Sequence, residues 1–312
     1  MTRYVLGRLA STALMFLAIT LFVFVAFSRI PQPRGRRDPG DAYHLHGTLA
    51  WQYAHFLWRF VGHGDLGYSS VSRQAVTTQL LHAAPVTLSL VAGGLVVWLL
   101  IALPLGVVSA LRPRRVADRA STVVALVGLS RHPVWLGLML SWVFGRYLHV
   151  LPASGYCPVA DLSTGCNGLG RWASHLFLPW ATFGIVNAAL FSTLLRALLL
   201  EELGADYVRT ALAKGVGGAR VVRAHVLQNV MLPLMTMLGL LAGTSLAGVI
   251  FIESAFDLPG LGGILRQATL RHDLPLTAGS VLFLALAIVL LNLVVDLAYA
   301  TVDPRIRVML PE

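Results

Sequence analysis

Six long apolar runs, separated by polar segments, constrain the fold of this chain more than any other feature. A helix needs about 20 residues to cross a hydrocarbon core about 30 Å thick, and each run is long enough. Only 12% of the residues are charged, against about 25% in a soluble domain. We therefore predict an all-α polytopic membrane protein with six transmembrane helices. The runs cover residues 9–27, 84–111, 120–145, 176–195, 230–252 and 276–295.

Arg3 and Arg8 precede the first run, as basic residues also precede the apolar core of a secretory signal peptide. We interpret 9–27 as a retained span, because it is too long for such a core and no small-x-small cleavage site follows it. Six spans place both termini on one side. Arginines are then densest in the internal segment 112–119, although the external arginines within 29–37 depart from the positive-inside rule. We expect both termini in the cytoplasm.

The net charge of +10 suggests an anionic partner, either nucleic acid or lipid headgroups. Membrane lipid is the better interpretation, because the basic residues lie mostly at the ends of apolar runs. The single lysine, Lys214, follows Ala213 and not the glycine that a G-x-x-x-x-G-K-[ST] phosphate-binding loop requires. Any ATP chemistry therefore belongs to another polypeptide. We predict no ATPase site, no cofactor and no nucleic-acid partner for this chain.

Residues 29–82 are too polar to span a membrane and form an external region. The aromatic residues within 51–60 predict an amphipathic helix at the membrane surface. Four histidines in the region suggest a metal site, but their spacing fits no compact set of ligands, and we favour solvated side chains and no metal. The histidines are His44, His46, His55 and His63.

Cys157 and Cys166 are the two cysteines of the chain, and both fall in the external segment between the third and fourth runs. An even count in a short loop on an oxidising side indicates a disulfide. Two free thiols are the alternative, and metal binding by two cysteines alone is disfavoured.

The polar segment 201–233 is too long and too patterned for a plain connection between two apolar runs. Within it, the apolar and polar residues of 206–214 fall on opposite faces of a helix, and the glycines of 215–218 end that helix. A second amphipathic stretch, 219–229, leads into the fifth run. The short helix is either a lever docked in a soluble partner or a surface helix held on lipid headgroups by its arginines. Its apolar face holds Tyr207, Val208, Ala211 and Leu212, and its polar face holds Asp206, Arg209, Thr210 and Ala213.

Residues 206–215 read D-Y-V-R-T-A-L-A-K-G and are followed by His225, Asn229 and Pro233. This pattern resembles the peptide-importer variant of the coupling loop in ATP-binding-cassette (ABC) importer permeases. The general signature of these permeases is E-A-A, three residues, G, and nine residues later I-x-L-P. Here Arg209 and Gln228 replace its glutamate and proline, and these departures are those of the peptide branch.

Other stretches are similar to the first of the two permease types in this family. They are 3–9 (R-Y-V-L-G-R-L), 64–69 (G-D-L-G-Y-S) and 253–262 (E-S-A-F-D-L-P-G-L-G), followed by Asn292, Asp296 and 303–305 (D-P-R). The expected P-G-D-P after the first span is incomplete, because 39–42 reads P-G-D-A. The resemblance covers nearly the whole chain, with its motifs in the family's order.

The resemblance implies the type I ABC importer permease fold in a bacterial inner membrane. It implies a single permease domain over 1–312, with an N-terminal helix at 1–28, the external region 29–82 and a core at 83–312. A second homologous permease, two ATP-binding subunits that hold ATP and Mg, and an extracytoplasmic solute-binding protein are the implied partners. The solute would be a di- or oligopeptide. The coupling helix would be 206–218, with Asp206, Tyr207, Arg209, Thr210, Ala211, Lys214 and Gly215 as its residues.

Polar residues inside the spans suggest a pathway. Arg131 lies near the middle of the third run, where Pro133 can kink the helix, and a charge there is costly. Arg131 either meets a solute carboxylate or pairs with an acid of a partner subunit. The glycine-rich loop 259–263 is either an outer gate or a connector. The pathway and gate candidates are Arg131, His132, Glu253, Phe256, Pro259 and Gly260.

Two other classes fit the sequence less well. An ion-driven secondary transporter predicts paired carboxylates at mid-membrane and an inverted repeat, and neither is found. A membrane scaffold would not need a glycine-stopped surface helix. Within the leading class, permeases for nickel, glutathione and peptides share these motifs, so the sequence does not separate their solutes.

Overall fold

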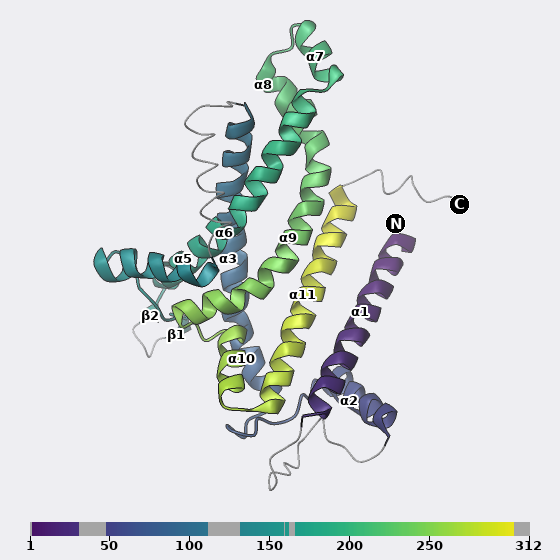
Figure 1. Ribbon diagram of the computed structural model, residues 1–312, viewed down its shortest axis with the longest axis vertical. Helices are drawn as coiled ribbons and strands as arrows, with labels where there is room; N and C mark the ends of the chain where they lie inside the picture. Colours follow the sequence, from purple (N-terminus) through teal and green to yellow (C-terminus); the bar gives the residue numbers. More distant parts are fainter. Residues whose placement is uncertain (1, 31–47, 112–131, 159, 162–165, 303–312) are drawn as a thin grey trace. The chain divides into compact units, whose positions relative to one another are not determined.

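The computed structural model describes residues 2–30, 48–111, 132–158, 160–161 and 166–302. Within these ranges the chain is almost entirely helical (Figure 1), with one short antiparallel pair of strands, β1 (Ala160–Asp161) and β2 (Cys166–Asn167). The helices are α1 (Thr2–Ser28), α2 (Leu49–His63), α3 (Val76–Leu111), α5 (Pro133–Leu140), the π-helix η1 (Ser141–Tyr147), α6 (Leu169–Leu203), α7 (Asp206–Ala213), α8 (Gly218–Val221), the π-helix η2 (Val222–Val226), α9 (Leu227–Phe256), α10 (Leu261–Leu270) and α11 (Leu274–Val302).

Five of the described helices are long and apolar enough to cross a membrane. They contain the first, second, fourth, fifth and sixth predicted runs. The third run is described only in its second half, as α5 and η1, and residues 120–131 lie outside the described ranges. The count of six spans therefore stays a prediction. The five segments are Leu6–Ser28, Val76–Leu111, Leu169–Leu203, Pro233–Phe256 and Leu274–Val294.

Pro133 begins a helix and does not kink one, which differs from our expectation for the third run. His132 is extended, with φ −64° and ψ 140°, and Pro133 occupies the first position of α5. The ring of a proline clashes with a helical residue before it, so it pushes that residue into extended backbone. Proline is favoured at the first helical position, because the N–H that it lacks would have no partner within the helix there.

The first of two compact units comprises residues 1–89 and 257–297. It holds α1, α2, the beginning of α3, α10 and most of α11. Its core gathers apolar side chains from these elements, among them Phe24, Phe56 and Leu80, each at most 1% exposed.

The aromatic helix α2 turns its apolar side to α1 within this unit. The ring of Phe56 lies 5.5 Å from that of Phe24, and the Tyr53 hydroxyl lies 3.0 Å from that of Thr20. Trp58 stays 60% exposed. The predicted amphipathic helix therefore exists, and part of its apolar face is used for packing within the chain.

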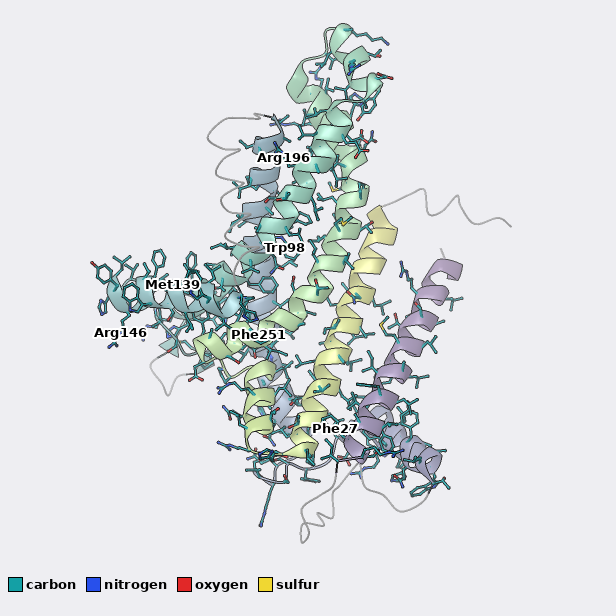
Figure 2. The ribbon with its side chains drawn as sticks, in the orientation of Figure 1. Phe27, Trp98, Met139, Arg146, Arg196 and Phe251 are labelled. Carbon is teal, nitrogen blue, oxygen red and sulfur yellow. The ribbon has the colours of Figure 1, made fainter. Side chains whose placement is uncertain are left out.

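The second unit comprises residues 90–256 and 298–312. In it, α3 and α6 approach closely because glycines face large side chains. A Cβ placed on Gly94 would lie 2.7 Å from the Phe183 ring, and one on Gly184 would lie 2.6 Å from Val97. Trp98, labelled in Figure 2, is fully buried at this contact. These small residues serve helix packing.

Candidate functional site

The polar segment between α6 and α9 forms a helical turn-back at one end of the second unit. After α6 ends, Gly204 and Ala205 interrupt the helix, and α7 follows. The chain then returns through α8 and η2 into α9. Figure 1 shows α7 and α8 beyond the ends of α6 and α9. The structure thus has a separate short helix where the sequence predicts one.

Local interactions explain the start of α7. Ala205 is extended at the helix entrance, and Asp206 lies in the first turn, where a negative charge is favoured by the helix dipole. The Thr210 hydroxyl donates to the carbonyl oxygen of Asp206 at 2.9 Å. Arg209 lies 3.9 Å from the Asp206 carboxylate, and both side chains are exposed, so this ion pair adds little stability.

Gly215 ends α7 in a backbone conformation that other residues rarely adopt. Its φ is +81°. Its N–H donates to the carbonyl of Leu212 at 2.9 Å, and the N–H of Val216 donates to that of Ala211 at 3.2 Å. These two bonds form a Schellman motif, which satisfies carbonyls at the helix end.

The apolar face expected on α7 is only partly covered. Val208 is 3% exposed, whereas Leu212 is 49% exposed and Tyr207 is 38% exposed. Lys214 and Arg209 are exposed as well. This end of the unit therefore presents apolar and basic side chains together.

The Tyr207 hydroxyl connects α7 to the ends of both long helices. It donates to Glu202 Oε2 of α6 at 2.6 Å and accepts a hydrogen bond from Asn229 Nδ2 of α9 at 3.2 Å. Burial, and then the bond to the Glu202 carboxylate, raise the pKa of Tyr207 above its ordinary value. Tyr207 and Asn229 belong to the quoted pattern, but Glu202 was not among the predicted site residues. Its position beside another acid in the last turn of α6 was the available signal.

Three of the pathway candidates lie in the second unit near α5 and the end of α9. His132 caps α5, with Nδ1 accepting from Val134 N at 3.5 Å, and its ring meets that of Phe251 edge-on at 4.6 Å. Glu253 and Phe256 are buried, and a Cβ on Gly137 of α5 would lie 3.0 Å from the Phe256 ring. Arg131 lies outside the described residues, as do 39–42 and 303–305.

The glycine-rich segment 259–263 is not a loop throughout, which corrects our expectation. Gly262 and Gly263 belong to the first turn of α10, and Gly260 is its N-cap, while Pro259 is exposed before it. The Thr87 hydroxyl of α3 accepts from Leu261 N at 2.9 Å, which satisfies one N–H at the start of the helix.

A buried carboxylate that the sequence did not single out secures the segment between α2 and α3 in the first unit. Asp273 is 1% exposed. It accepts from Ser69 Oγ at 2.5 Å and from Ser70 N at 3.1 Å. Ser69 lies in the G-D-L-G-Y-S stretch, so this motif supports the start of α11.

Asp65 of the same stretch pairs with Arg59 of α2 at 2.5 Å and accepts from Gly67 N at 2.8 Å. Burial raises the pKa of Asp65, but the bonds from Arg59 and Gly67 outweigh burial and hold it below the ordinary value.

Cys157 is fully buried and disulfide-bonded. The chain has one other cysteine, Cys166, whose side chain lies outside the described ones. The pairing of the two stays a prediction. Among the described residues, no group of three or more His, Cys, Asp or Glu side chains could hold a metal ion.

The long apolar helices and the polar, exposed turn-back helix of the second unit fit a membrane transport component. Residues 102–308 match the family described as the binding-protein-dependent transport system inner membrane component, and the chain belongs to this family. The protein is therefore a multi-pass inner-membrane permease subunit of an ABC importer. It is not itself an ATPase and carries no cofactor of its own. Its transport system includes ATPase and solute-binding partners.

Proteins named as peptide permeases are similar to this chain over nearly their whole length. The dipeptide transport system permease protein DppB of Escherichia coli (strain K12) is 34% identical over 339 residues, which cover 98% of this chain and 99% of that protein. The di/tripeptide transport system permease protein DppB of Pseudomonas aeruginosa (strain UCBPP-PA14) is 33% identical over 334 residues, with 98% and 99% covered. The dipeptide transport system permease protein DppB of Alkalihalophilus pseudofirmus is 30% identical over 333 residues, with 98% and 100% covered.

Proposed function

We propose that this chain forms half of the translocation pathway of an importer for di- and oligopeptides. Relatives named for dipeptide and di/tripeptide transport support this solute class. A second homologous permease supplies the other half, and two ATP-binding subunits drive the cycle. The chain is a single permease domain of the type I importer fold with six spans, and both termini are cytoplasmic.

The α7 helix is the coupling element, and its bridge to two long helices carries this proposal. Its tip is exposed, so an ATP-binding subunit has access to it. Tyr207 ties it to Glu202 of α6 and Asn229 of α9. A displacement of α7 by the ATPases is therefore passed to both helices at once. The residues in this role are Asp206, Tyr207, Arg209, Thr210, Ala211, Lys214 and Gly215.

The pathway takes its residues from the third and fifth spans, and the outer gate takes its residues from the segment that follows the fifth span. Arg131, His132, Glu253 and Phe256 border the pathway, and Pro259 and Gly260 belong to the gate. Cys157 pairs with Cys166 on the outer side. Glu253 and Phe256 are buried near α5, so a movement of α9 against α5 would change how they pack. This supports their place beside the pathway.

The coupling role is tested by placing a charge on the half-buried side of α7. Ala211→Glu, compared with the small neutral Ala211→Ser, is assembled with the partner permease, the ATPases and the binding protein. We expect Ala211→Glu to assemble and hydrolyse ATP but to take up much less dipeptide per ATP. Wild-type uptake by Ala211→Glu would remove the coupling assignment.

A further inference from the structure

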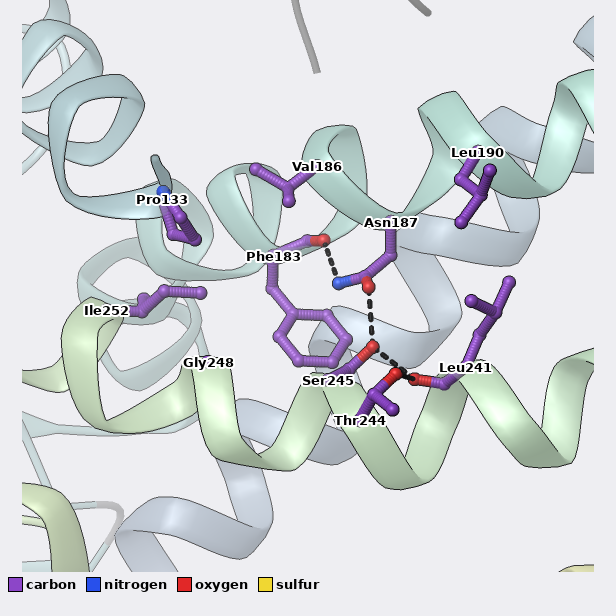
Figure 3. Close-up of a pocket in the computed structure, with 10 residues that line it drawn as sticks. All are labelled: Pro133, Phe183, Val186, Asn187, Leu190, Leu241, Thr244, Ser245, Gly248 and Ile252. Atoms are coloured by element: carbon purple, nitrogen blue, oxygen red, sulfur yellow. Dashed lines mark hydrogen bonds between the residues drawn. The ribbon is translucent and has the colours of Figure 1, made fainter. Parts of the chain in front are cut away.

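A cavity of about 310 Å³ lies between α5, α6 and α9 in the second unit (Figure 3). Its volume is at the lower end of that of small-molecule sites. The part of its wall that the described residues form is mainly apolar, with one amide and two hydroxyl groups and no ionisable side chain. The lining residues are Pro133, Phe183, Val186, Asn187, Leu190, Leu241, Thr244, Ser245, Gly248 and Ile252.

The polar groups of the cavity lie halfway along two membrane-spanning helices. Asn187 lies 18 residues after Leu169 and 16 before Leu203, the ends of α6. Ser245 lies 12 residues after Pro233 and 11 before Phe256, the ends of the apolar segment of α9. Neutral polar side chains at this depth form hydrogen bonds between helices, as Ser245 of α9 and Asn187 of α6 do.

Asn187 retains hydrogen-bonding capacity toward the cavity. Its Nδ2 donates to the carbonyl of Phe183 at 2.8 Å, and its Oδ1 accepts from the Ser245 hydroxyl at 2.5 Å. A side-chain amide has two N–H donors and two acceptor lone pairs. These two bonds use one donor and one lone pair, so the other donor and lone pair suit a ligand that both accepts and donates.

Gly248 keeps the space beside these groups open. A Cβ built on it would meet no atom within 4 Å. The packing glycines of this unit differ: Gly94 and Gly184 each face a side-chain atom within 3 Å of such a Cβ. Gly248 therefore preserves volume in the cavity and does not serve a close helix contact here.

We propose that this cavity is a solute-contact site for an uncharged, amide-bearing segment, such as the backbone of a short peptide. The proposal rests on the transport function proposed above and adds the residues that meet the solute. A peptide bond offers one N–H and one C=O, which match the remaining lone pair and donor of Asn187. Divalent cations such as nickel prefer imidazole, thiolate or carboxylate ligands, and the described residues of the wall offer none of them.

Two variants and one control test the site in the complete transporter, with both permeases, the ATPases and the binding protein in membrane vesicles. Asn187→Leu removes the amide at similar size, and Gly248→Leu fills the open volume. Thr193→Val is the control, because its hydroxyl bonds to Ala189 O of its own helix at 3.0 Å. The probe is radiolabelled alanyl-alanine, with radioactive nickel ion as the comparison.

We expect dipeptide uptake per ATP hydrolysed to fall roughly tenfold in Asn187→Leu, the effect of one lost hydrogen bond of the stronger kind. Gly248→Leu should lose at least as much, and Thr193→Val should match the wild type. Wild-type uptake by both cavity variants would overturn the proposal. Transport of nickel but not of the dipeptide by the wild-type transporter would overturn the solute class that we propose.

A photoreactive benzophenone residue in place of Thr244, which is exposed beside the cavity, identifies the occupant directly without relying on a loss of activity. Illumination during turnover should attach the labelled dipeptide to this chain. If residue 244 crosslinks to the second permease and no dipeptide is attached, the cavity is part of a subunit interface and the proposal is overturned. If the dipeptide is attached while Ala211→Glu stays coupled, the coupling role fails and this site stands.

Discussion

Tyr207 shows how one side-chain group can join three elements. Its hydroxyl belongs to α7, donates to the last turn of α6 and accepts from the first turn of α9. The acceptor is a carboxylate, and hydrogen bonds to charged groups are stronger than neutral ones. The position of α7 relative to the two long helices therefore depends on this hydroxyl.

Replacing Tyr207 with phenylalanine keeps the ring and removes both bonds. We expect uptake per ATP to fall several-fold, because α7 then moves without carrying α6 and α9 with it. The ratio of solute transported to ATP hydrolysed is the measurement. Tyr68→Phe, at an exposed tyrosine of the first unit, is the control, and equal ratios for the two variants would contradict the role of the hydroxyl.

Gly215 and Gly217 form a matched pair for testing the end of α7. A Cβ on either glycine would meet open space, but Gly215 alone of the two has a positive φ, +81°. Gly215→Ala should therefore destabilise the helix end by about 1–2 kcal/mol, and Gly217→Ala should be nearly neutral. Hydrogen exchange of the Gly215 and Val216 amides measures this. Equal exchange in both variants would mean that backbone strain is not the cause.

Asp273 is expected to matter for stability because its buried carboxylate accepts several hydrogen bonds. Asp273→Asn turns an acceptor atom into a donor that faces other donors, at a cost of about 1–3 kcal/mol. Asp257→Asn, at a weak exposed ion pair with Arg266 of 3.8 Å, should cost less than about 1 kcal/mol. Thermal unfolding in detergent compares them, and similar midpoints would refute the prediction.

At the scale of elements, long apolar runs were sufficient to place five membrane-spanning helices. The ends of these helices were less predictable. We expected the second span to begin at 84, yet α3 begins at Val76, because its first turns hold polar residues that pack and hydrogen-bond outside the apolar segment. Thr77, for example, donates to Gly64 O.

The break before Pro133 and the first turn of α10 differ in how far the sequence alone could predict them. The extended backbone of His132 follows from the proline that comes next, and this local rule was available from the sequence. By contrast, α10 starts at Leu261 with the help of Thr87, which is 174 residues away. Asp273 and Glu202 were missed for the same reason, since their partners are distant or lie in another helix.

The pair of Asp65 and Arg59 predicts a pH dependence in the connection between α2 and α3. Because the pKa of Asp65 lies below its ordinary value of 3.8, the stabilisation is present above pH 3.8 and is lost as the pH falls through the lowered value. Protection of the Gly67 amide from hydrogen exchange, corrected for intrinsic rates, should fall in acid. Asp65→Asn should show low protection without this transition; an unchanged transition would exclude Asp65 as its source.

At the scale of the whole molecule, the two cysteines allow a simple chemical test. Cys157 is fully buried and disulfide-bonded. After denaturation without reductant, we expect a maleimide to label neither cysteine, and after reduction to label both. Cys166→Ser should expose one reactive thiol and lower stability by about 2–3 kcal/mol, as expected for opening a short loop. Labelling of both thiols before reduction would contradict the pairing.

The class and the membrane character were recognisable from the sequence, because they depend on long apolar runs and on contiguous motifs. The cavity was not, since α5, α6 and α9 contribute to it from widely separated positions. Asn187 and Gly248 look ordinary in sequence. They become candidates for a site because both line the cavity in the second unit.

Lys214, exposed at the end of α7, is the only lysine among the 312 residues. Apart from the amino terminus, the chain thus has one primary amine, and it lies beside Gly215 at the end of the helix that we propose as the coupling element. A single amine-reactive dye would report on this one position without any engineered cysteine. Its rate of reaction, compared in complexes with and without bound ATPases, would show whether the ATPases cover this position.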